Sequence, residues 1–187
     1  AQSRRLLDEA GWTVGPDGVR QKNGQRFSFV MLNRAGTVDR TLVAQVIQAG
    51  LKAVGIEVIF ETLESAAWTQ RWRRGQWEAI VSAWFLPADP GITGLYACKG
   101  ANNMAGFCDP ALDEILERSD KALSRETRLP LLHEAQARLA EQARMLPLYQ
   151  NVMPEVVSKR VSGYRGSGTN FGSFWNLWQW TLGDSPR

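Results

Sequence analysis

A long amphipathic helix between two strands is the feature that most limits what this chain can fold into. Residues 38–54 carry apolar side chains at helical spacing: Val38, Leu42, Val43, Val46, Ile47, Leu51 and Val54. The runs 27–32 and 56–63 on either side have the apolar and alternating patterns of strands. A short helix from Ser65 and a strand over 79–84 extend the order to β-α-β-α-β. This order predicts an α/β fold, with a mixed sheet flanked by helices.

The second half of the chain has a different pattern. Residues 85–108 show no periodicity and are expected to form a loop. Asp109 followed by Pro110 is typical of a helix start, with a capping side chain and proline at the first helical position. Ser124 opens another helix, in which Pro130 predicts a kink or a later start. A further strand is expected over 146–153.

Composition sets broad limits on the class of protein. The chain has 187 residues, 44% hydrophobic and 22% charged, which is typical of a globular domain with a core. The net charge of +3 is too small to indicate a nucleic-acid partner. No run approaches the roughly 18 apolar residues of a membrane span. The sequence opens without methionine inside a helix-like pattern, so we expect a piece of a longer protein.

Catalytic and metal-binding patterns are weak throughout the sequence. The single histidine, His133, lies in a polar helical stretch, and no nucleophile elbow, Walker loop or dinucleotide-binding glycine motif follows a strand. One histidine and two cysteines ten residues apart do not make a zinc pattern. We therefore expect no catalytic residue, no metal and no cofactor, and a protein that is not an enzyme.

The two cysteines, Cys98 and Cys108, lie at either end of one turn-rich stretch. One interpretation is a disulfide that clamps a long loop, which in the chain-entropy model stabilises the fold by roughly 3 kcal/mol. The alternative is two unrelated thiols in a cytosolic protein. Their placement around a single loop favours the bridge and an oxidising compartment.

Two loops are candidates for a binding site, because ligands of α/β sheets usually bind at the carboxyl ends of strands. One is the loop 33–36, where Arg34 could pair with a solute carboxylate or simply face solvent. The other begins at Trp84, where an aromatic ring could stack on a solute or belong to the core. In a parallel arrangement, both loops would lie at the same edge of the sheet.

A cluster of basic and aromatic residues at 71–74 suggests a different class of function. Arg71, Trp72, Arg73 and Arg74 could form a stacking surface for single-stranded nucleic acid. The alternative for the same residues is a solvated basic helix face beside a packed tryptophan. A nucleic-acid-binding or other interaction module therefore stays as the second hypothesis.

Several segments, in this order, resemble one known family. They are residues 5–12 before a glycine-rich turn, 47–58 across the end of the long helix, 84–90 ending in Asp-Pro, Asn103, 108–116, Arg128, and 146–149. Together they resemble the C-terminal lobe of the family 5 extracellular solute-binding proteins, which include dipeptide, oligopeptide and nickel-complex binders. The resemblance runs over nearly the whole chain.

The resemblance implies that residues 1–187 form a single C-terminal lobe, cut from a two-lobed protein whose N-terminal lobe is missing here. Such proteins are periplasmic or otherwise extracytoplasmic. They close around a small solute and deliver it to an ABC permease in the membrane, with no nucleic acid involved. We expect peptides or peptide-like solutes.

Six candidate ligand-binding residues follow from the resemblance and the strand ends: Asn33, Arg34, Trp84, Phe85, Leu86 and Asp89. Peptide binders of the family commonly place a carboxylate shortly after the tryptophan, where it holds the α-amino group of the peptide. The matching stretch 85–87 carries no acid, so Asp89 is the nearest candidate for that role.

The predicted disulfide can be tested by mass spectrometry. The intact protein, alkylated without reductant, should gain no label at Cys98 or Cys108 and should gain two labels after reduction. Two labelled thiols without reductant would contradict the bridge and remove the strongest sequence-based argument for an oxidising compartment.

Overall fold

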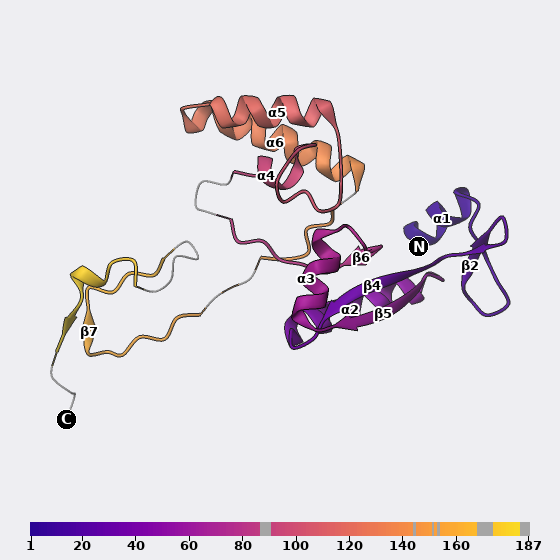
Figure 1. The fold of residues 1–187 in the computed structure, drawn as a ribbon, viewed down its shortest axis with the longest axis horizontal. Helices are drawn as coiled ribbons and strands as arrows, with labels where there is room; N and C mark the ends of the chain where they lie inside the picture. The colour runs from indigo at the N-terminus through magenta and orange to yellow at the C-terminus, as the bar shows by residue number, and fades with distance from the viewer. Residues whose placement is uncertain (87–90, 144, 151, 153, 168–173, 184–187) are drawn as a thin grey trace. The chain divides into compact units, whose positions relative to one another are not determined.

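The computed structural model describes residues 1–187 except 87–90, 144, 151, 153, 168–173 and 184–187 (Figure 1). The chain divides into two compact units, residues 1–83 and 84–187, each of which is described by itself. Among the described residues, no helix combines the length and the apolar character that crossing a membrane requires.

The first unit contains three helices and six strands among its described elements. In chain order they are α1 (Gln2–Glu9), β1 (Thr13–Val14), β2 (Arg20–Lys22), β3 (Gln25–Arg26), β4 (Ser28–Arg34), α2 (Val38–Lys52), β5 (Glu57–Leu63), α3 (Ser65–Arg73) and β6 (Ala79–Ile80). Strands β1, β2 and β3 form a small antiparallel sheet. The predicted β-α-β-α-β order is present in β4, α2, β5, α3 and β6.

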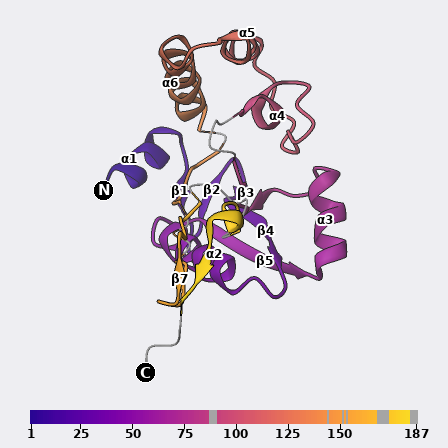
Figure 2. The ribbon, with the colours of Figure 1, turned by 90° about the vertical axis from the view of Figure 1, so that its left-hand side faces the viewer.

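The central sheet has the order β5-β4-β6, and all three strands are parallel. The connection through α2 moves from β4 to one side, and the connection through α3 returns across β4 to the other side. Because both crossovers are expected to be right-handed, opposite directions of travel place the two helices on opposite faces. Figure 2 shows α2 and α3 on opposite sides of β4 and β5. The predicted α/β lobe with helices around a sheet is confirmed. Among the described residues, the parallel and antiparallel strands form separate sheets and not the single mixed sheet that was expected.

The core of this unit lies between the sheet and α2. Met31, Ala44 and Val58 are buried there, with partly buried apolar neighbours at Phe29, Ile47, Leu51, Phe60, Ala79 and Val81. The helix face differs in part from the predicted one: Val38, Leu42 and Val46 are 71%, 57% and 73% exposed. The sequence contained two adjacent apolar stripes, and the sheet covers only the one that runs through Ala44.

Arg20 is buried, at 3% exposure, where the small sheet meets the end of α2. Its Nε donates to the carbonyl of Val54 at 2.8 Å, and its Nη1 donates to Asp8 Oδ1 at 2.6 Å. Nη1 also donates to the carbonyl of Trp12. Gly55 lies against this side chain with a φ of +86°, and a Cβ there would come within 2.9 Å of Arg20 Cγ. The arginine therefore joins α1, β2 and the turn that leads into β5.

Two strand ends differ from the sequence prediction. Asn33 and Arg34 belong to β4, because they pair with Thr62 and Leu63 of β5, so they do not start a loop. Strand β6 ends at Ile80, and Trp84 is 37% exposed, so the prediction that a buried strand runs to Trp84 was wrong. Only two residues of β6, Ala79 and Ile80, pair with β4. Residues 81–84 therefore do not continue the strand pairing.

The second unit contains α4 (Thr93–Tyr96), α5 (Pro110–Lys121), α6 (Arg125–Gln142), β7 (Val161–Ser162), the 3₁₀ helix η1 (Leu177–Gln179) and β8 (Thr181–Leu182). Helices α5 and α6 lie side by side (Figure 1), around a core of Ile92, Leu112, Ile115, Leu116, Leu132 and Ala135. Helix α6 continues through Pro130. Helix α4 lies within the predicted loop 85–108, and the predicted strand 146–153 is absent over residues 146–150.

The loop before α5 is closed by the predicted disulfide. Cys98 and Cys108 are bonded, with their Cα atoms 4.2 Å apart. Inside the loop, Asn103 Nδ2 donates to the carbonyls of Ala97 (2.9 Å) and Phe107 (2.6 Å). The backbone N–H of Cys98 donates to Asp113 Oδ1 on α5 at 2.9 Å. A stretch without regular structure is thereby fixed against α5.

Asp109 connects this loop to both helices. Its side chain caps α5 by accepting from the N–H of Ala111, as its position before Pro110 predicted. The same carboxylate accepts from Nε of Arg138 and, at 2.8 Å, from Nη2 of Arg138, and it also accepts from Gln142 on α6. The hydrogen bond from Arg138 is the main reason that the pKa of Asp109 lies well below its ordinary value.

The Asp109 network predicts a pH-dependent contribution to stability. Because its pKa is depressed in the folded state, the contribution is complete above the unfolded-state pKa of about 3.9 and is lost as the pH falls toward the folded-state pKa. Asp109→Asn keeps a capping side chain but not the charge, so it should lower the urea midpoint most at pH 7. The gap to wild type should narrow below about pH 4.

Glu117→Gln is the matched control, because it removes a carboxylate that pairs with Lys121 at the surface. The side chain of Glu117 is 66% exposed. It should leave the urea midpoint nearly unchanged at pH 7. A gap between Asp109→Asn and wild type that stays constant from pH 7 to pH 3 would contradict the role of the ionised carboxylate.

Candidate functional site

The order of the central sheet identifies where a ligand is expected in the first unit. The connection after β4 leads to β5 on one side of it, and the connection after β5 leads to β6 on the other side. The connections therefore diverge between β4 and β6. In open α/β sheets, ligands bind outside the carboxyl ends of the strands at such a point. Here that edge contains Asn33 and Arg34 at the end of β4, and residues 81–83 after β6.

Asn33 and Arg34 point to opposite faces of the sheet, as successive residues of a strand do. Asn33 lies on the α2 side. Its Nδ2 donates to Thr62 Oγ1 at 3.3 Å, and its Oδ1 accepts from Thr41 Oγ1 of α2 at 3.2 Å. These contacts hold β4, β5 and α2 together at the edge where the site is expected.

Arg34 lies on the α3 side and is half-buried. Its Nε donates to Ser65 Oγ at 3.0 Å, and its Cζ lies 5.8 Å from the centre of the Trp68 ring. Trp68 is 4% exposed and stacks on Trp72 with ring centres 5.6 Å apart. Among the described residues, neither Nη nitrogen of Arg34 has a hydrogen-bond partner. The arginine thus has a supported guanidinium with two donor groups still available.

The remaining candidate residues lie in the second unit. Trp84, Phe85 and Leu86 are 37%, 65% and 42% exposed, so they provide apolar surface directly after the last residues of the first unit. Asp89 lies outside the described residues. Asn33 and Arg34 lie at the same edge of the sheet but on opposite faces, so the structure does not bring their side chains together. The association of residues 84–86 with Arg34 stays a prediction.

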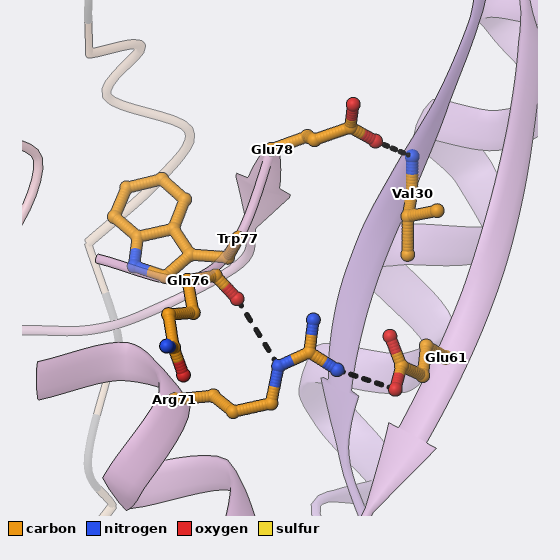
Figure 3. A pocket seen from close by; sticks show the side chains of 6 residues that line it. All are labelled: Val30, Glu61, Arg71, Gln76, Trp77 and Glu78. Carbon is orange, nitrogen blue, oxygen red and sulfur yellow. Dashed lines mark hydrogen bonds and ion pairs between the residues drawn. The ribbon is translucent and has the colours of Figure 1, made fainter. Parts of the chain in front are cut away.

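A hollow of about 580 Å³ lies on the α3 side of the sheet, near the start of β6 (Figure 3). Its lining consists of Val30, Glu61, Arg71, Gln76, Trp77 and Glu78. Its charged groups already have partners within the protein. Arg71 pairs with Glu61 and donates from Nε to the carbonyl of Gln76 at 3.1 Å, and Glu78 Oε2 accepts from the N–H of Val30 at 2.6 Å. The charged groups of this hollow are therefore less available to a ligand than the guanidinium of Arg34 at the edge of the sheet.

Two of the four residues in the basic and aromatic cluster at 71–74, Arg71 and Trp72, contact other parts of the first unit. The guanidinium of Arg71 pairs with Glu61 of β5, and the ring of Trp72 stacks on Trp68. Arg73 and Arg74 are exposed. The cluster therefore does not present a continuous stacking surface, which leaves the nucleic-acid hypothesis without a geometric argument. No group of histidine, cysteine, aspartate or glutamate suited to a metal ion occurs in the part of the chain that the structure describes.

Ser65 and Trp68 are site residues that the sequence reasoning missed. A helix was predicted to begin at Ser65, and α3 does begin there, but the contact of the Ser65 hydroxyl, which accepts from Arg34 Nε, was not predicted. Trp68 was not among the six candidate ligand-binding residues. The available signal was that residues 65, 68 and 72 share one helix face, which packs where β4 ends.

Comparison with known proteins identifies relatives of the chain. The family described as "Bacterial extracellular solute-binding proteins, family 5 Middle" matches residues 1–106. Protein XP55 of Streptomyces lividans is 34% identical over 146 residues, covering 74% of this chain and 26% of that protein. Di/tripeptide-binding protein 2 of Pseudomonas aeruginosa is 32% identical over 172 residues, covering 89% of this chain and 31% of that protein.

Solved structures agree with the sequence relatives. An oligopeptide-binding protein from Thermus thermophilus, complexed with a pentapeptide, superposes with a TM-score of 0.78 at 28% identity. The superposition covers 96% of this chain and 35% of that one. The chain therefore spans about a quarter to a third of the length of the relatives described here.

The contacts of Asn33 predict a structural role that can be measured. Asn33→Ala removes two side-chain hydrogen bonds between β4, β5 and α2, and should lower the free energy of unfolding by about 1–2 kcal/mol. The matched control is Asn102→Ala, at an exposed loop asparagine, which should change it by less than about 0.5 kcal/mol. Urea denaturation measures both changes, and equal effects of the two substitutions would contradict the assignment.

Proposed function

This chain belongs to the family 5 bacterial extracellular solute-binding proteins, and from that premise we propose that it captures a solute for import by an ABC transporter. In this proposal, residues 1–187 are the C-terminal lobe of a two-lobed protein that works in the periplasm. The lobes close around the solute, and the closed form is favoured because the solute contacts both lobes. The membrane partner is the permease of the transporter.

Peptides or peptide-like solutes are the proposed cargo. Two kinds of relative support this class: a curated protein named as a di/tripeptide-binding protein, and a solved oligopeptide-binding protein complexed with a pentapeptide. A peptide has one feature that this chain is equipped to bind, which is a terminal carboxylate. Trp84, Phe85 and Leu86 are proposed as further ligand-binding residues, because they expose apolar surface.

The observation that carries the proposal is the pair of available Nη nitrogens on Arg34. They lie at the carboxyl end of β4, where ligands usually bind in α/β sheets of this kind. A guanidinium with two donors free can bind both oxygens of one carboxylate, and such charge-assisted bonds are stronger than neutral ones. Arg34 is proposed to hold the carboxylate of the solute.

The family is one of solute-binding proteins, and we propose that this member has no enzymatic activity. His133 lies on α6, in the second unit, away in sequence from both proposed binding segments. Among the predicted ligand-binding residues, Asp89 is the one carboxylate, and its predicted role is to hold an amine. The others supply a guanidinium, an amide and apolar or aromatic surface, which suit recognition of a solute and not acid–base chemistry.

The role of Arg34 can be tested in the full-length binding protein. Arg34→Gln should weaken the binding of trialanine by roughly tenfold to a hundredfold, as expected for losing a charge-assisted pair. Binding of trialanine amide, which has no carboxylate, should be weak in wild type and unchanged by the substitution. Isothermal calorimetry measures both affinities. Equal binding of the acid and the amide by wild-type protein would contradict the proposed recognition of a carboxylate.

A further inference from the structure

The guanidinium of Arg34 is held by one face of α3. Ser65, Trp68 and Trp72 are spaced three and four residues apart, so their side chains lie on the same side of the helix. Ser65 accepts a hydrogen bond from Arg34 Nε at 3.0 Å, and the ring of Trp68 lies 5.8 Å from Cζ. Trp72 stacks behind Trp68 at 21° between the ring planes. A polar contact and an aromatic contact thus act on the same planar group.

The hydrogen bond to Ser65 decides which donors remain for a ligand. A guanidinium can bind a carboxylate side-on, through Nε and one Nη, or end-on, through both Nη nitrogens. Because Nε already donates to Ser65, only the end-on arrangement leaves every donor with a single partner. The orientation of the arginine, and not only its charge, is therefore set before any solute arrives.

The choice of tryptophan at position 68 is energetically unfavourable in one respect, which indicates a role beyond filling space. The side chain is buried, and its indole Nε1 has no hydrogen-bond partner in the part of the chain that the structure describes. A buried N–H without a partner is unfavourable, and a phenylalanine at this position would avoid it. Indole, however, is the aromatic side chain that attracts a cation most strongly. The contact with Arg34 is a favourable interaction that a phenylalanine ring would make more weakly.

We propose that Ser65 and Trp68 are positioning residues, which pre-orient Arg34 to bind a solute carboxylate end-on through its two Nη nitrogens. This inference rests on the proposed function of Arg34. Ser65 and Trp68 themselves need not touch the solute. They act by restricting the arginine side chain, which would otherwise lose rotamer freedom when the solute binds.

The first test observes Arg34 directly, without a ligand. In the full-length protein labelled with [15N]arginine, the Nε–Hε signal that disappears in Arg34→Lys belongs to Arg34. In wild type this proton should exchange slowly with water, and the nearby indole ring should shift its resonance. Ser65→Ala should speed the exchange about tenfold or more, because the acceptor is lost. Thr69→Ala is the matched control, since its hydroxyl donates to the carbonyl of Ser65 one turn away.

Trp68 is tested by two substitutions of the same residue. Trp68→Met removes the ring and should return the Hε resonance toward its value in an unstructured peptide. Trp68→Phe keeps a ring and should retain much of the shift. If Trp68→Met does not fold, Trp68→Phe tests the ring contact, and an Hε resonance at its value in an unstructured peptide in a folded Trp68→Phe protein would contradict the role of the ring. Ser65→Ala tests the Ser65 contact separately, because alanine is well tolerated in the first turn of a helix.

The second test measures the consequence for binding. Ser65→Ala should weaken trialanine binding about threefold to tenfold and leave trialanine amide within about twofold, with Thr69→Ala unchanged for both. Unchanged exchange of Arg34 Hε in Ser65→Ala, or an equal loss for acid and amide, would overturn the inference. Altered exchange in a protein that does not prefer the acid would instead confirm the positioning contacts and refute the proposed function of Arg34.

Discussion

The buried guanidinium of Arg20 is the interaction on which the first unit depends most. A charge that is almost completely removed from water is stable only when it is fully paired, and Arg20 is paired with Asp8, Trp12 and Val54, which belong to different segments. One side chain thereby fixes the small antiparallel sheet to the turn that precedes β5. Since β5 enters the sheet from that turn, Arg20 also helps to set where β5 begins.

The register of β4 determines which side chain it presents on each face at the far end of the sheet. Strands β4 and β5 pair over seven consecutive residues, from Ser28 opposite Glu57 to Arg34 opposite Leu63. Successive side chains alternate between faces, so a shift of one residue would move Arg34 to the α2 face and Asn33 to the α3 face. The arginine would then lie away from Ser65 and Trp68. The geometry of the candidate site is therefore a consequence of strand register.

Features that depend on neighbouring residues could be predicted from the sequence, and features that depend on distant partners could not. The cap of α5 by Asp109, the long helix α2 and the α/β class were predicted, because each follows from local spacing. The expected strand over 146–153 was wrong over 146–150, since strand-like residues form a strand only where a partner is present. The support of Arg34 by Ser65 was missed because the two residues are 31 positions apart. The disulfide is present as predicted. It could be predicted because the two cysteines lie at either end of one short loop.

The position of the disulfide has a consequence for how the protein can be produced. Both cysteines of the chain lie in the second unit, and the first unit contains none. Expression in a reducing cytoplasm therefore removes no covalent bond from the first unit, while the loop before α5 loses its covalent closure. A preparation of this kind can retain the fluorescence and the sheet content of a folded protein and still contain a second unit that proteases cut near residues 98–108. Quality control for this chain should accordingly be based on resistance to limited proteolysis and not on spectroscopy alone.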